Sequence, residues 1–374
     1  MTIEIMDKIN IGVIFGGRSG EHEVSLMSAR SVLDALDQER YKITQIGISH
    51  DGEWLVGENI LEKMTEGKIA GLSSAAMFPD PSRQGLFLIK ETQSREVVEH
   101  LVALDVVFPV LHGTFGEDGT LQGFLEMVGV AYVGAGVLGS SVGMDKGVFR
   151  EVMLANGIPV VDTMVVLRSE IDKNIDQVAS RAEQLTSYPM FVKPANTGSS
   201  VGVSKCHSRS DLIEGMLDAA RFDRRILVQR AVNAREIEVS VLGNDLPEAS
   251  IPGEIRPAAE FYSYDAKYND ANSELLIPAP LSDEMVKRIR SLAIKAYKAI
   301  DCAGMARVDF FFDQDTSEIY LGEVNTIPGF TKISMYPKLW EASGLPYPRL
   351  IDRLVDLALE RKADRDRTEW RYKN

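Results

Sequence analysis

Two short segments near the C-terminal end of the chain alternate between apolar and polar residues. They read ARVDFFF and IYLGEVN, and the run DQDTS, rich in turn-forming residues, separates them. This alternation predicts an antiparallel β-hairpin. Because successive side chains of a strand point to opposite faces, Arg307 and Asp309 share one face, and so do Glu323 and Asn325. We therefore expect one guanidinium and three oxygen-bearing side chains to converge.

A cluster of hard oxygen donors suits magnesium, which takes few protein ligands and completes its shell with water and substrate phosphate oxygens. We assign Asp309, Glu323 and Asn325 as candidate metal ligands, with Arg307 as a charge-stabilising group for phosphoryl transfer. The alternative is a solvated polar face with ordinary cross-strand ion pairs. The next residues, TIPGF at 326–330, predict a turn whose backbone N–H groups could meet an anion.

Composition limits the possible partners. The 374 residues carry a net charge of -14, and 45% of them are hydrophobic, which is typical of a soluble globular protein of two or three domains. No basic surplus exists to neutralise the phosphates of nucleic acid or of an anionic membrane, so we expect neither partner. Cys206 and Cys302 are too few for a disulfide framework. Without a signal-like start or a long apolar run, we expect a cytoplasmic protein.

The order of the apolar runs predicts three units and a fold that combines α/β with α+β. Residues 1–140 alternate strands and helices as a parallel α/β domain does. Residues 141–230 read as a smaller α+β unit, and residues 231–374 hold the hairpin and a long helix at 282–300. Ser282 is a suitable N-cap for that helix, which has acidic residues in its first turn.

A second chemistry-bearing segment is FVKPANTGSSVGV at 191–203. A predicted strand delivers Lys193, and the loop that follows is made of glycines and hydroxyl residues, so its backbone N–H groups could fold over phosphates. It is not a Walker A loop, because no glycine-rich run here ends in Gly-Lys-Ser or Gly-Lys-Thr. An ordinary hairpin turn is the alternative.

The run GAGVLG at 134–139 matches the dinucleotide-binding fingerprint, and Asp162 lies further along the chain. It leaves an NAD-dependent enzyme as an alternative. The fingerprint normally opens the first βαβ unit of a domain, whereas this run follows several predicted strands. The match is therefore weaker evidence for a nicotinamide cofactor than the two phosphate-handling segments are for a nucleoside triphosphate.

Three further loops carry candidate residues. Glu21 lies in GGRSGEHEVS, between the first predicted strand and helix, where it could meet a ligand ammonium or cap the helix. His112 lies in LHGTFGEDG, after a buried strand, where it could equally be a structural loop residue. The segment FYSYDAKY at 261–268 could be a packed loop or a cover that excludes water from a phosphorylated intermediate.

These segments, in this order, resemble the D-alanine:D-alanine ligases of the ATP-grasp superfamily along almost the whole chain. Six motifs carry the resemblance: GGRSGEHEVS, HGTFGEDG, MDK, KPANTGSSVG, YDAKY and EVNTIPGFT. The resemblance implies a three-domain ATP-grasp fold, with ATP between the central and C-terminal domains, and a homodimer formed through the N-terminal domain. It also implies that ATP phosphorylates one D-alanine and that the amine of a second attacks the acyl phosphate, for peptidoglycan precursor synthesis.

The same resemblance implies catalytic roles. Glu21, linked by hydrogen bonds to Ser199 and Tyr268, would bind the ammonium of the first D-alanine. Arg307 and the backbone N–H of Gly329 would stabilise the oxyanion of the tetrahedral intermediate. The resemblance implies two more substrate contacts. Ser334 would contact the carboxylate of the second substrate, and His112 would lie beside the first substrate.

The resemblance also implies ATP with two magnesium ions, for which manganese could substitute, held by the three hairpin ligands. Lysine ammonium groups would lie beside the phosphates, and the glycine-serine loop would lie above them. A carboxylate would reach the ribose hydroxyls. The implied nucleotide contacts are Lys146, Lys193, Gly198, Ser199, Ser200, Gly202, Gln229, Glu236 and Lys267.

One position departs from the family pattern. Gln229 stands where the family usually has a glutamate, at the end of the strand that leads to the nucleotide, so we expect an effect on nucleotide affinity and none on the chemistry. The tyrosine at Tyr268 favours an amine acceptor, most simply D-alanine. D-serine or D-lactate as acceptor, and a nucleotide-binding regulator that has lost catalysis, stay as alternatives.

Overall fold

The apolar character of the first strand decides how the N-terminal part is built. The structure is a computed structural model, and it describes residues 8–198, 201–256, 274–331 and 333–369. In β1 (Ile9–Gly16), the side chains of Ile11, Val13 and Phe15 enter one hydrophobic cluster and that of Ile14 enters another. A strand that is buried on both faces needs helices above and below it, as in a parallel sheet.

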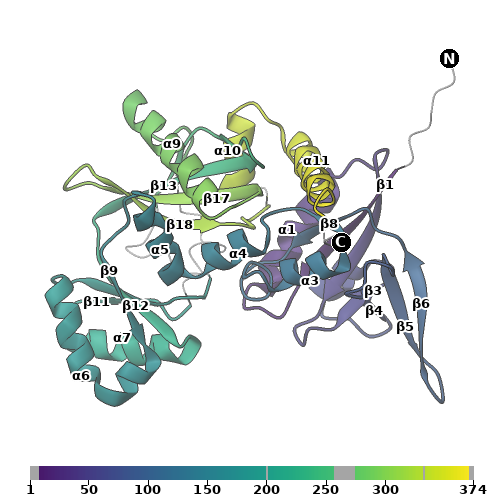
Figure 1. Cartoon of the computed structure of the whole chain (residues 1–374), viewed down its shortest axis with the longest axis horizontal. Coiled ribbons are helices and arrows are strands. Elements are labelled where there is room, and N and C mark those ends of the chain that lie inside the picture. Colours follow the sequence, from purple (N-terminus) through teal and green to yellow (C-terminus); the bar gives the residue numbers. More distant parts are fainter. Residues whose placement is uncertain (1–7, 199–200, 257–273, 332, 370–374) are drawn as a thin grey trace.

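The N-terminal sheet has eight strands in the order β6-β5-β4-β3-β2-β1-β7-β8 (Figure 1). The strands β2, β1, β7 and β8 are parallel, as the sequence predicts, whereas β3 to β6 extend the sheet by antiparallel pairing. The antiparallel strands are short, and β6 is largely exposed, so their apolar pattern is too weak to predict. The strands after β1 are β2 (Tyr41–Ile48), β3 (Trp54–Val56), β4 (Ser73–Ala76), β5 (Leu86–Glu91), β6 (Glu96–Val102), β7 (Val106–Val110) and β8 (Ala131–Tyr132).

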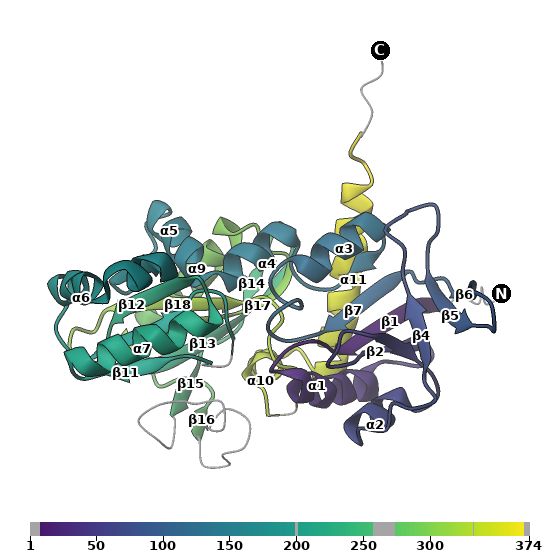
Figure 2. The ribbon, with the colours of Figure 1, turned by 90° about the horizontal axis from the view of Figure 1, so that it is seen from below.

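Helices cover both faces of this sheet. Figure 2 shows α3 (Thr120–Val128) on one side and α1 (His22–Ala35) with α2 (Ile60–Thr65) on the other. The last helix of the chain, α11 (Tyr347–Arg365), joins the side of α1, where its buried leucines share a core cluster with β1 and β7. The Arg361 side chain on α11 also donates hydrogen bonds to the backbone carbonyl oxygens of Tyr132 and Gly134.

A four-stranded antiparallel sheet follows, in the order β11-β10-β12-β9. Two helices cover one of its faces, where Met190, Val192, Ile226 and Val228 are buried in a common cluster. Alternation therefore turns the neighbouring residues of β10 and β12 to the opposite face. The elements are β9 (Thr163–Leu167), α6 (Arg168–Leu185), β10 (Met190–Pro194), β11 (Ser204–Cys206), α7 (Arg209–Phe222) and β12 (Arg225–Arg230).

The third sheet holds the predicted hairpin, now β17 and β18, and its order is β16-β15-β13-β17-β18 with β14 beside β13. The helix α9 packs against it, and the Ser282 hydroxyl accepts a hydrogen bond from the Met285 N–H at 3.3 Å, which confirms the predicted N-cap. The elements are β13 (Ala234–Gly243), β14 (Glu248–Ala249), β15 (Gly253–Arg256), β16 (Glu274–Leu276), α9 (Asp283–Ala299), β17 (Gly304–Asp313), β18 (Ile319–Asn325) and α10 (Met335–Ala342).

Two helices, α4 (Val137–Met144) and α5 (Lys146–Ala155), follow β8, and none of the described helices combines the length and apolar run that a membrane crossing needs. The last glycine of the fingerprint-like run has a packing role here. A Cβ atom on Gly139 would lie 3.1 Å from the Cys302 Cα, and one on Gly143, which follows the run on the same helix, would lie 3.2 Å from the Val324 carbonyl oxygen. Helix α4 therefore approaches the third sheet closely, and this approach accounts for Gly139 without a dinucleotide.

This close approach gives a stability prediction. Gly139→Ala should lower the free energy of unfolding by about 1–2 kcal/mol, because the new methyl group meets backbone atoms that cannot move aside. The matched control is Gly123→Ala, also in a helix, where a Cβ meets nothing within 4 Å. That control should be stabilised by roughly 0.5–1 kcal/mol through helix propensity. Urea unfolding of both variants is the measurement, and equal shifts in the two would contradict the packing role.

Candidate active site

The hairpin presents its polar residues as the sequence predicts. In the pairing of β17 with β18, Arg307 lies opposite Asn325, and Asp309 lies opposite Glu323. Directly opposite residues of an antiparallel pair point to the same side, so the four side chains share one face. Between Asp309 and Phe310 the register shifts, and Gly322 is left without a partner across the hairpin. A Cβ on Gly322 would lie 3.1 Å from the Asp309 carbonyl oxygen, so a residue without a side chain suits this position.

Arg307 lies between two carboxylates. Its Nε and Nη2 donate to Oδ1 and Oδ2 of Asp309 at 2.8 and 2.7 Å, and its Nε lies 3.0 Å from Oε2 of Glu238 on β13. Burial disfavours the charged guanidinium, but the attraction of Asp309 and Glu238 outweighs it and raises the pKa of Arg307 well above its usual value. Arg307 is therefore a fixed positive charge at the hairpin face.

The predicted metal ligands are in contact with one another. The Asn325 Nδ2 donates to Asp309 Oδ2 at 2.9 Å and lies 3.5 Å from Glu323 Oε1. No three His, Cys, Asp or Glu side chains within the described ranges gather as a metal site, so the set here is two carboxylates and one amide. Magnesium needs only one or two carboxylates when phosphate oxygens and water complete its shell. The donor set fits that ion.

Glu21 is enclosed by two glycine loops. It occupies the N-cap position of α1 and is only 9% exposed. A Cβ on Gly113 would lie 2.4 Å from Glu21 Oε2, and a Cβ on Gly198 would lie 2.6 Å from the same oxygen. Glycine at both positions therefore lets the loop after β7 and the loop after β10 reach this carboxylate. The predicted partners Ser199 and Tyr268 lie outside the described residues.

His112 links the first sheet to the loop after β18. Its Nδ1 lies 3.1 Å from the Ile327 carbonyl oxygen, so Nδ1 carries the hydrogen and donates. Its Nε2 then accepts from the Ser28 hydroxyl at 3.1 Å, and the Ser28 oxygen in turn accepts from the Phe330 N–H at 3.4 Å. Burial lowers the pKa of His112, although the Glu21 charge opposes this. The neutral imidazole therefore acts as a bridge between the two segments.

The residues after β18 form a compact turn around Ser334. The Ser334 hydroxyl accepts from the Thr331 N–H at 3.1 Å and lies 2.8 Å from Thr331 Oγ1. A Cβ on Gly329 would lie 2.8 Å from Ser334 Oγ, so these two predicted substrate contacts are neighbours. The Phe330 ring is buried against Phe108 and anchors the turn to the first sheet.

The predicted nucleotide residues lie on two sheets and one helix end. Lys146, the first residue of α5, donates from Nζ to the Thr197 carbonyl oxygen at 2.7 Å, next to Gly198. Lys193 and Gln229 lie on the face of the four-stranded sheet that α6 and α7 leave uncovered. The Gln229 side chain donates to Thr163 Oγ1 at 3.1 Å, not to another predicted site residue. Gly202 has a φ of +69° and closes the loop, Glu236 lies on β13 opposite Phe311, and Ser200 and Lys267 lie outside the described residues.

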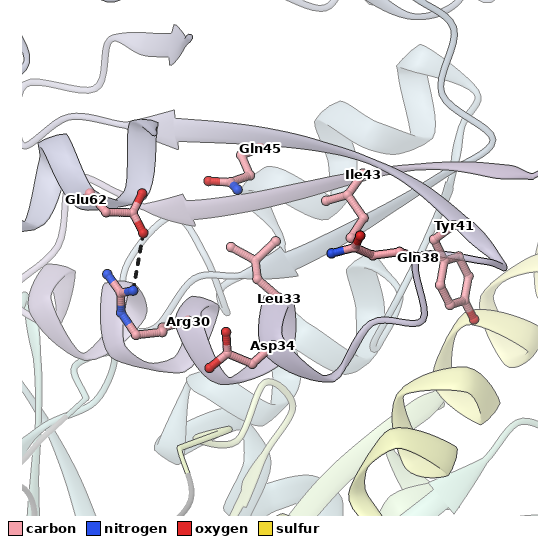
Figure 3. A pocket seen from close by; sticks show the side chains of 8 residues that line it. All are labelled: Arg30, Leu33, Asp34, Gln38, Tyr41, Ile43, Gln45 and Glu62. Atoms are coloured by element: carbon pink, nitrogen blue, oxygen red, sulfur yellow. Dashed lines mark hydrogen bonds and ion pairs between the residues drawn. The ribbon is translucent and has the colours of Figure 1, made fainter. Parts of the chain in front are cut away.

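A surface pocket of about 480 Å³ lies elsewhere, between α1, α2 and β2 (Figure 3). An ion pair of 3.2 Å joins Arg30 and Glu62 across it, and Tyr41 lies at its other end. No predicted site residue lines it. Its polar, open character separates it from the buried cluster around Arg307, and we assign it no part in the chemistry.

Two family models match this chain. Residues 10–135 match the family model described as the D-ala D-ala ligase N-terminus, and residues 152–356 match the one described as the D-ala D-ala ligase C-terminus. The chain belongs to the D-alanine–D-alanine ligase family. The GGRSGEHEVS and HGTFGEDG motifs lie within the first match, and the hairpin lies within the second.

Relatives match almost the full length of the chain. The D-alanine–D-alanine ligase of Natranaerobius thermophilus is 48% identical, with 97% of this chain and 98% of the relative covered. That of Heliobacterium modesticaldum is 49% identical, with the same coverage. Among solved structures, the VanG D-Ala:D-Ser ligase of Enterococcus faecalis has a TM-score of 0.83 at 34% identity, covering 94% of this chain and 100% of that one. The Coxiella burnetii D-alanine–D-alanine ligase has a TM-score of 0.79 at 36% identity, covering 96% of each chain. The predicted ATP-grasp family is confirmed.

Three residues of this family member's site were not predicted from sequence. Ser28 and Glu117 bind the loop after β18, and Glu238 pairs with Arg307. Glu238 follows Glu236 by two positions on the same strand. Alternation could therefore have placed both carboxylates on one face, the face of the sheet that carries Arg307 and Asp309. For Ser28 and Glu117 the local sequence carries no such signal, because their partners lie far along the chain.

Glu117 is buried near the carboxylates of Glu21 and Glu323. Its Oε2 accepts from the Gly113 N–H at 2.7 Å, and its Oε1 accepts from the Ile327 N–H at 3.3 Å. Burial, with the nearby Glu21 charge second, raises the pKa of Glu117 to about 8. The two backbone donors lower the pKa of Glu117 but do not offset burial and the repulsion from Glu21.

The buried imidazole predicts a pH dependence of stability. Unfolded His112 takes up a proton near pH 6.5, whereas the folded, buried ring takes it up only at lower pH. Between these values the unfolded state binds more protons, so stability falls as the pH decreases below about 6.5. His112→Gln cannot be protonated, and its unfolding free energy should fall less between pH 7 and pH 5 than that of the wild type.

The control for this prediction is His100→Gln, which removes an exposed imidazole on β6. Its loss of stability on acidification should match that of the wild type. Urea unfolding at both pH values is the measurement. An unchanged pH slope in His112→Gln would show that the ring is not kept neutral by the fold.

Proposed function

We propose that this chain joins two D-alanine molecules to D-alanyl-D-alanine, with ATP hydrolysed to ADP and phosphate and D-alanyl phosphate as the intermediate. Membership of the D-alanine–D-alanine ligase family supports the reaction. The observation that carries it is the contact among Arg307, Asp309, Glu323 and Asn325, directly before the turn that holds Gly329. Fixed positive charge, oxygen ligands and backbone donors then lie in one place.

In the first step, a carboxylate oxygen of D-alanine attacks the γ-phosphorus of ATP. The new O–P bond forms as the bond to the β–γ bridging oxygen breaks, and ADP leaves with that electron pair. Asp309, Glu323 and Asn325 would hold two magnesium ions, or manganese, which neutralise charge on the phosphates. Glu21, buried between two glycine loops, is suited to the ammonium of this first substrate.

Positive side chains from other segments would complete the phosphate site. Lys146 already contacts the backbone of the glycine-serine loop through Thr197, so it would hold that loop near the phosphates. Lys193 and Lys267 would add charge, and Gly198, Ser199, Ser200 and Gly202 would offer backbone and hydroxyl donors. Gln229 and Glu236 would contact the nucleoside.

In the second step, the amine of another D-alanine attacks the acyl carbon of D-alanyl phosphate. A C–N bond forms, the carbonyl oxygen carries the negative charge until the C–O bond to phosphate breaks, and the departing phosphate takes up the proton that the amine loses. Arg307 and the Gly329 N–H would stabilise that oxyanion. Ser334, next to Gly329, would bind the carboxylate of the acceptor, and Ser199 and Tyr268 would align Glu21.

We further propose the organisation that the resemblance implies. The chain would form an N-terminal domain at 1–140, a central domain at 141–230 and a C-terminal domain at 231–374, and two copies would pair through the N-terminal domain. The net charge of -14 supports a protein that works without nucleic acid or membrane partners, and we place it in the cytoplasm.

A product assay tests the reaction. Phosphate release is measured with ATP and magnesium, with D-alanine alone and then with D-serine or D-lactate added, and the products are identified by mass. D-alanyl-D-alanine from D-alanine alone is expected. A mixed product formed in preference to it would move the assignment toward the activity named for the Enterococcus faecalis structure. ATP binding without phosphate release in any mixture would favour the regulator.

The metal assignment predicts the effect of one substitution. Glu323→Gln should lower turnover by about 100-fold, because a neutral amide holds magnesium weakly and charge neutralisation on the phosphates is lost. Excess magnesium should restore part of the activity. Glu318→Gln, an exposed position at the start of the same hairpin region, is the control and should keep wild-type turnover. Wild-type turnover in Glu323→Gln would refute the assignment.

A further inference from the structure

The turn that carries Gly329 is held at three backbone atoms by side chains of α1 and of the loop after β7. His112 donates to the Ile327 carbonyl oxygen, Ser28 accepts from the Phe330 N–H, and Glu117 accepts from the Ile327 N–H at 3.3 Å. These contacts join residues that are more than two hundred positions apart in the chain. The position of the Gly329 N–H therefore depends on residues outside the hairpin and outside its turn.

Glu117 differs from the other two because it accepts backbone N–H groups from two segments at once. While Oε1 accepts from Ile327, Oε2 accepts from the Gly113 N–H at 2.7 Å, and Gly113 belongs to the loop that closes over Glu21. Both carboxyl oxygens are thus occupied by backbone donors, one from the loop after β7 and one from the turn after β18. Beside the His112 contact to Ile327, the Glu117 side chain therefore ties the backbone of the Glu21 loop directly to the backbone of the Gly329 turn.

We infer that Glu117 is a positioning residue for the second step of the reaction, because it keeps the Gly329 N–H at the distance from Glu21 that the tetrahedral intermediate requires. The inference rests on the proposed function. Glu117 itself touches no reacting atom. The first step, at the γ-phosphate, uses the hairpin ligands and lysines and does not need this spacing. Loss of the bridge should therefore slow dipeptide formation more than acyl phosphate formation.

The chain offers a matched control beside Glu117. Asp118 also accepts two backbone N–H groups, from Phe115 and Thr120 at 2.9 Å each, but both donors lie within three residues of it, in its own loop and at the start of α3. Glu117→Gln and Asp118→Asn each replace one of two acceptor oxygens with an NH2 group that cannot accept. Damage to the loop should be similar in the two variants, and only Glu117→Gln disturbs the turn at Ile327.

The experiment separates the two steps. ATP labelled with ¹⁸O in the β–γ bridge loses that label from the bridge position only when acyl phosphate forms and returns, so the exchange rate reports the first step, and D-alanyl-D-alanine reports the second. For Glu117→Gln we expect dipeptide formation to fall on the order of 10–100-fold, with exchange retained, so that the exchange-to-product ratio rises. Asp118→Asn should keep the wild-type ratio.

Several outcomes would overturn the inference. If Glu117→Gln and Asp118→Asn have the same ratio, Glu117 has no positioning role, and if Glu117→Gln loses exchange and product equally, its role lies in the first step. A wild-type protein that makes no dipeptide would refute the proposed function and the inference with it. Should Glu117→Gln fail to fold, Glu117→Asp decides: it keeps both oxygens but is too short to reach both donors, so a wild-type ratio in that variant would overturn the bridge.

Discussion

The buried charge of Arg307 is the constraint on which the hairpin and its neighbours depend. On the other side of β17, Ala306, Val308 and Phe310 are buried in the core beneath α9. A slip of one residue in the pairing with β13 would turn the guanidinium into that core and the aromatic ring out of it. The slip would carry Arg307 and Asp309 into that core together and away from Glu238 of β13, a costly burial of charge, whereas the native register places Glu238 beside the guanidinium. Stability and the arrangement of the polar face therefore require the same register.

Glycine decides how separate segments share the space around this face. Gly113 and Gly198 let two loops touch Glu21, and Gly139 lets α4 lie against the third sheet. In each case the missing side chain is the feature that matters, since a Cβ would lie too close to an atom already there. The polar site is assembled by close backbone approach, with hydrogen bonds fixing what the glycines permit.

Local patterns predicted the parts of the fold that are set locally. The hairpin, the N-cap at Ser282 and the parallel strands around β1 follow from alternation, capping chemistry and continuous burial. The run at 134–139 shows the limit of such patterns, because Gly139, which serves helix packing, stands where the fingerprint would have its last glycine. Ser28 and Glu117 could not be placed, since the turn residues that they bind, Phe330 and Ile327, follow more than two hundred residues later and no pattern in one sequence connects them.

The position of α11 has a consequence for synthesis. Leu350, Leu354 and Leu357 share a core cluster with Ile11 and Phe15, so the last helix completes a core that the first strand begins. A ribosome delivers the N-terminal sheet well before it delivers this helix. The sheet face beside α1 therefore stays partly uncovered during most of translation, and the nascent chain carries an exposed apolar surface until its final segment emerges. Folding of the first unit is completed by the end of the chain, and a prematurely terminated product would keep that surface open.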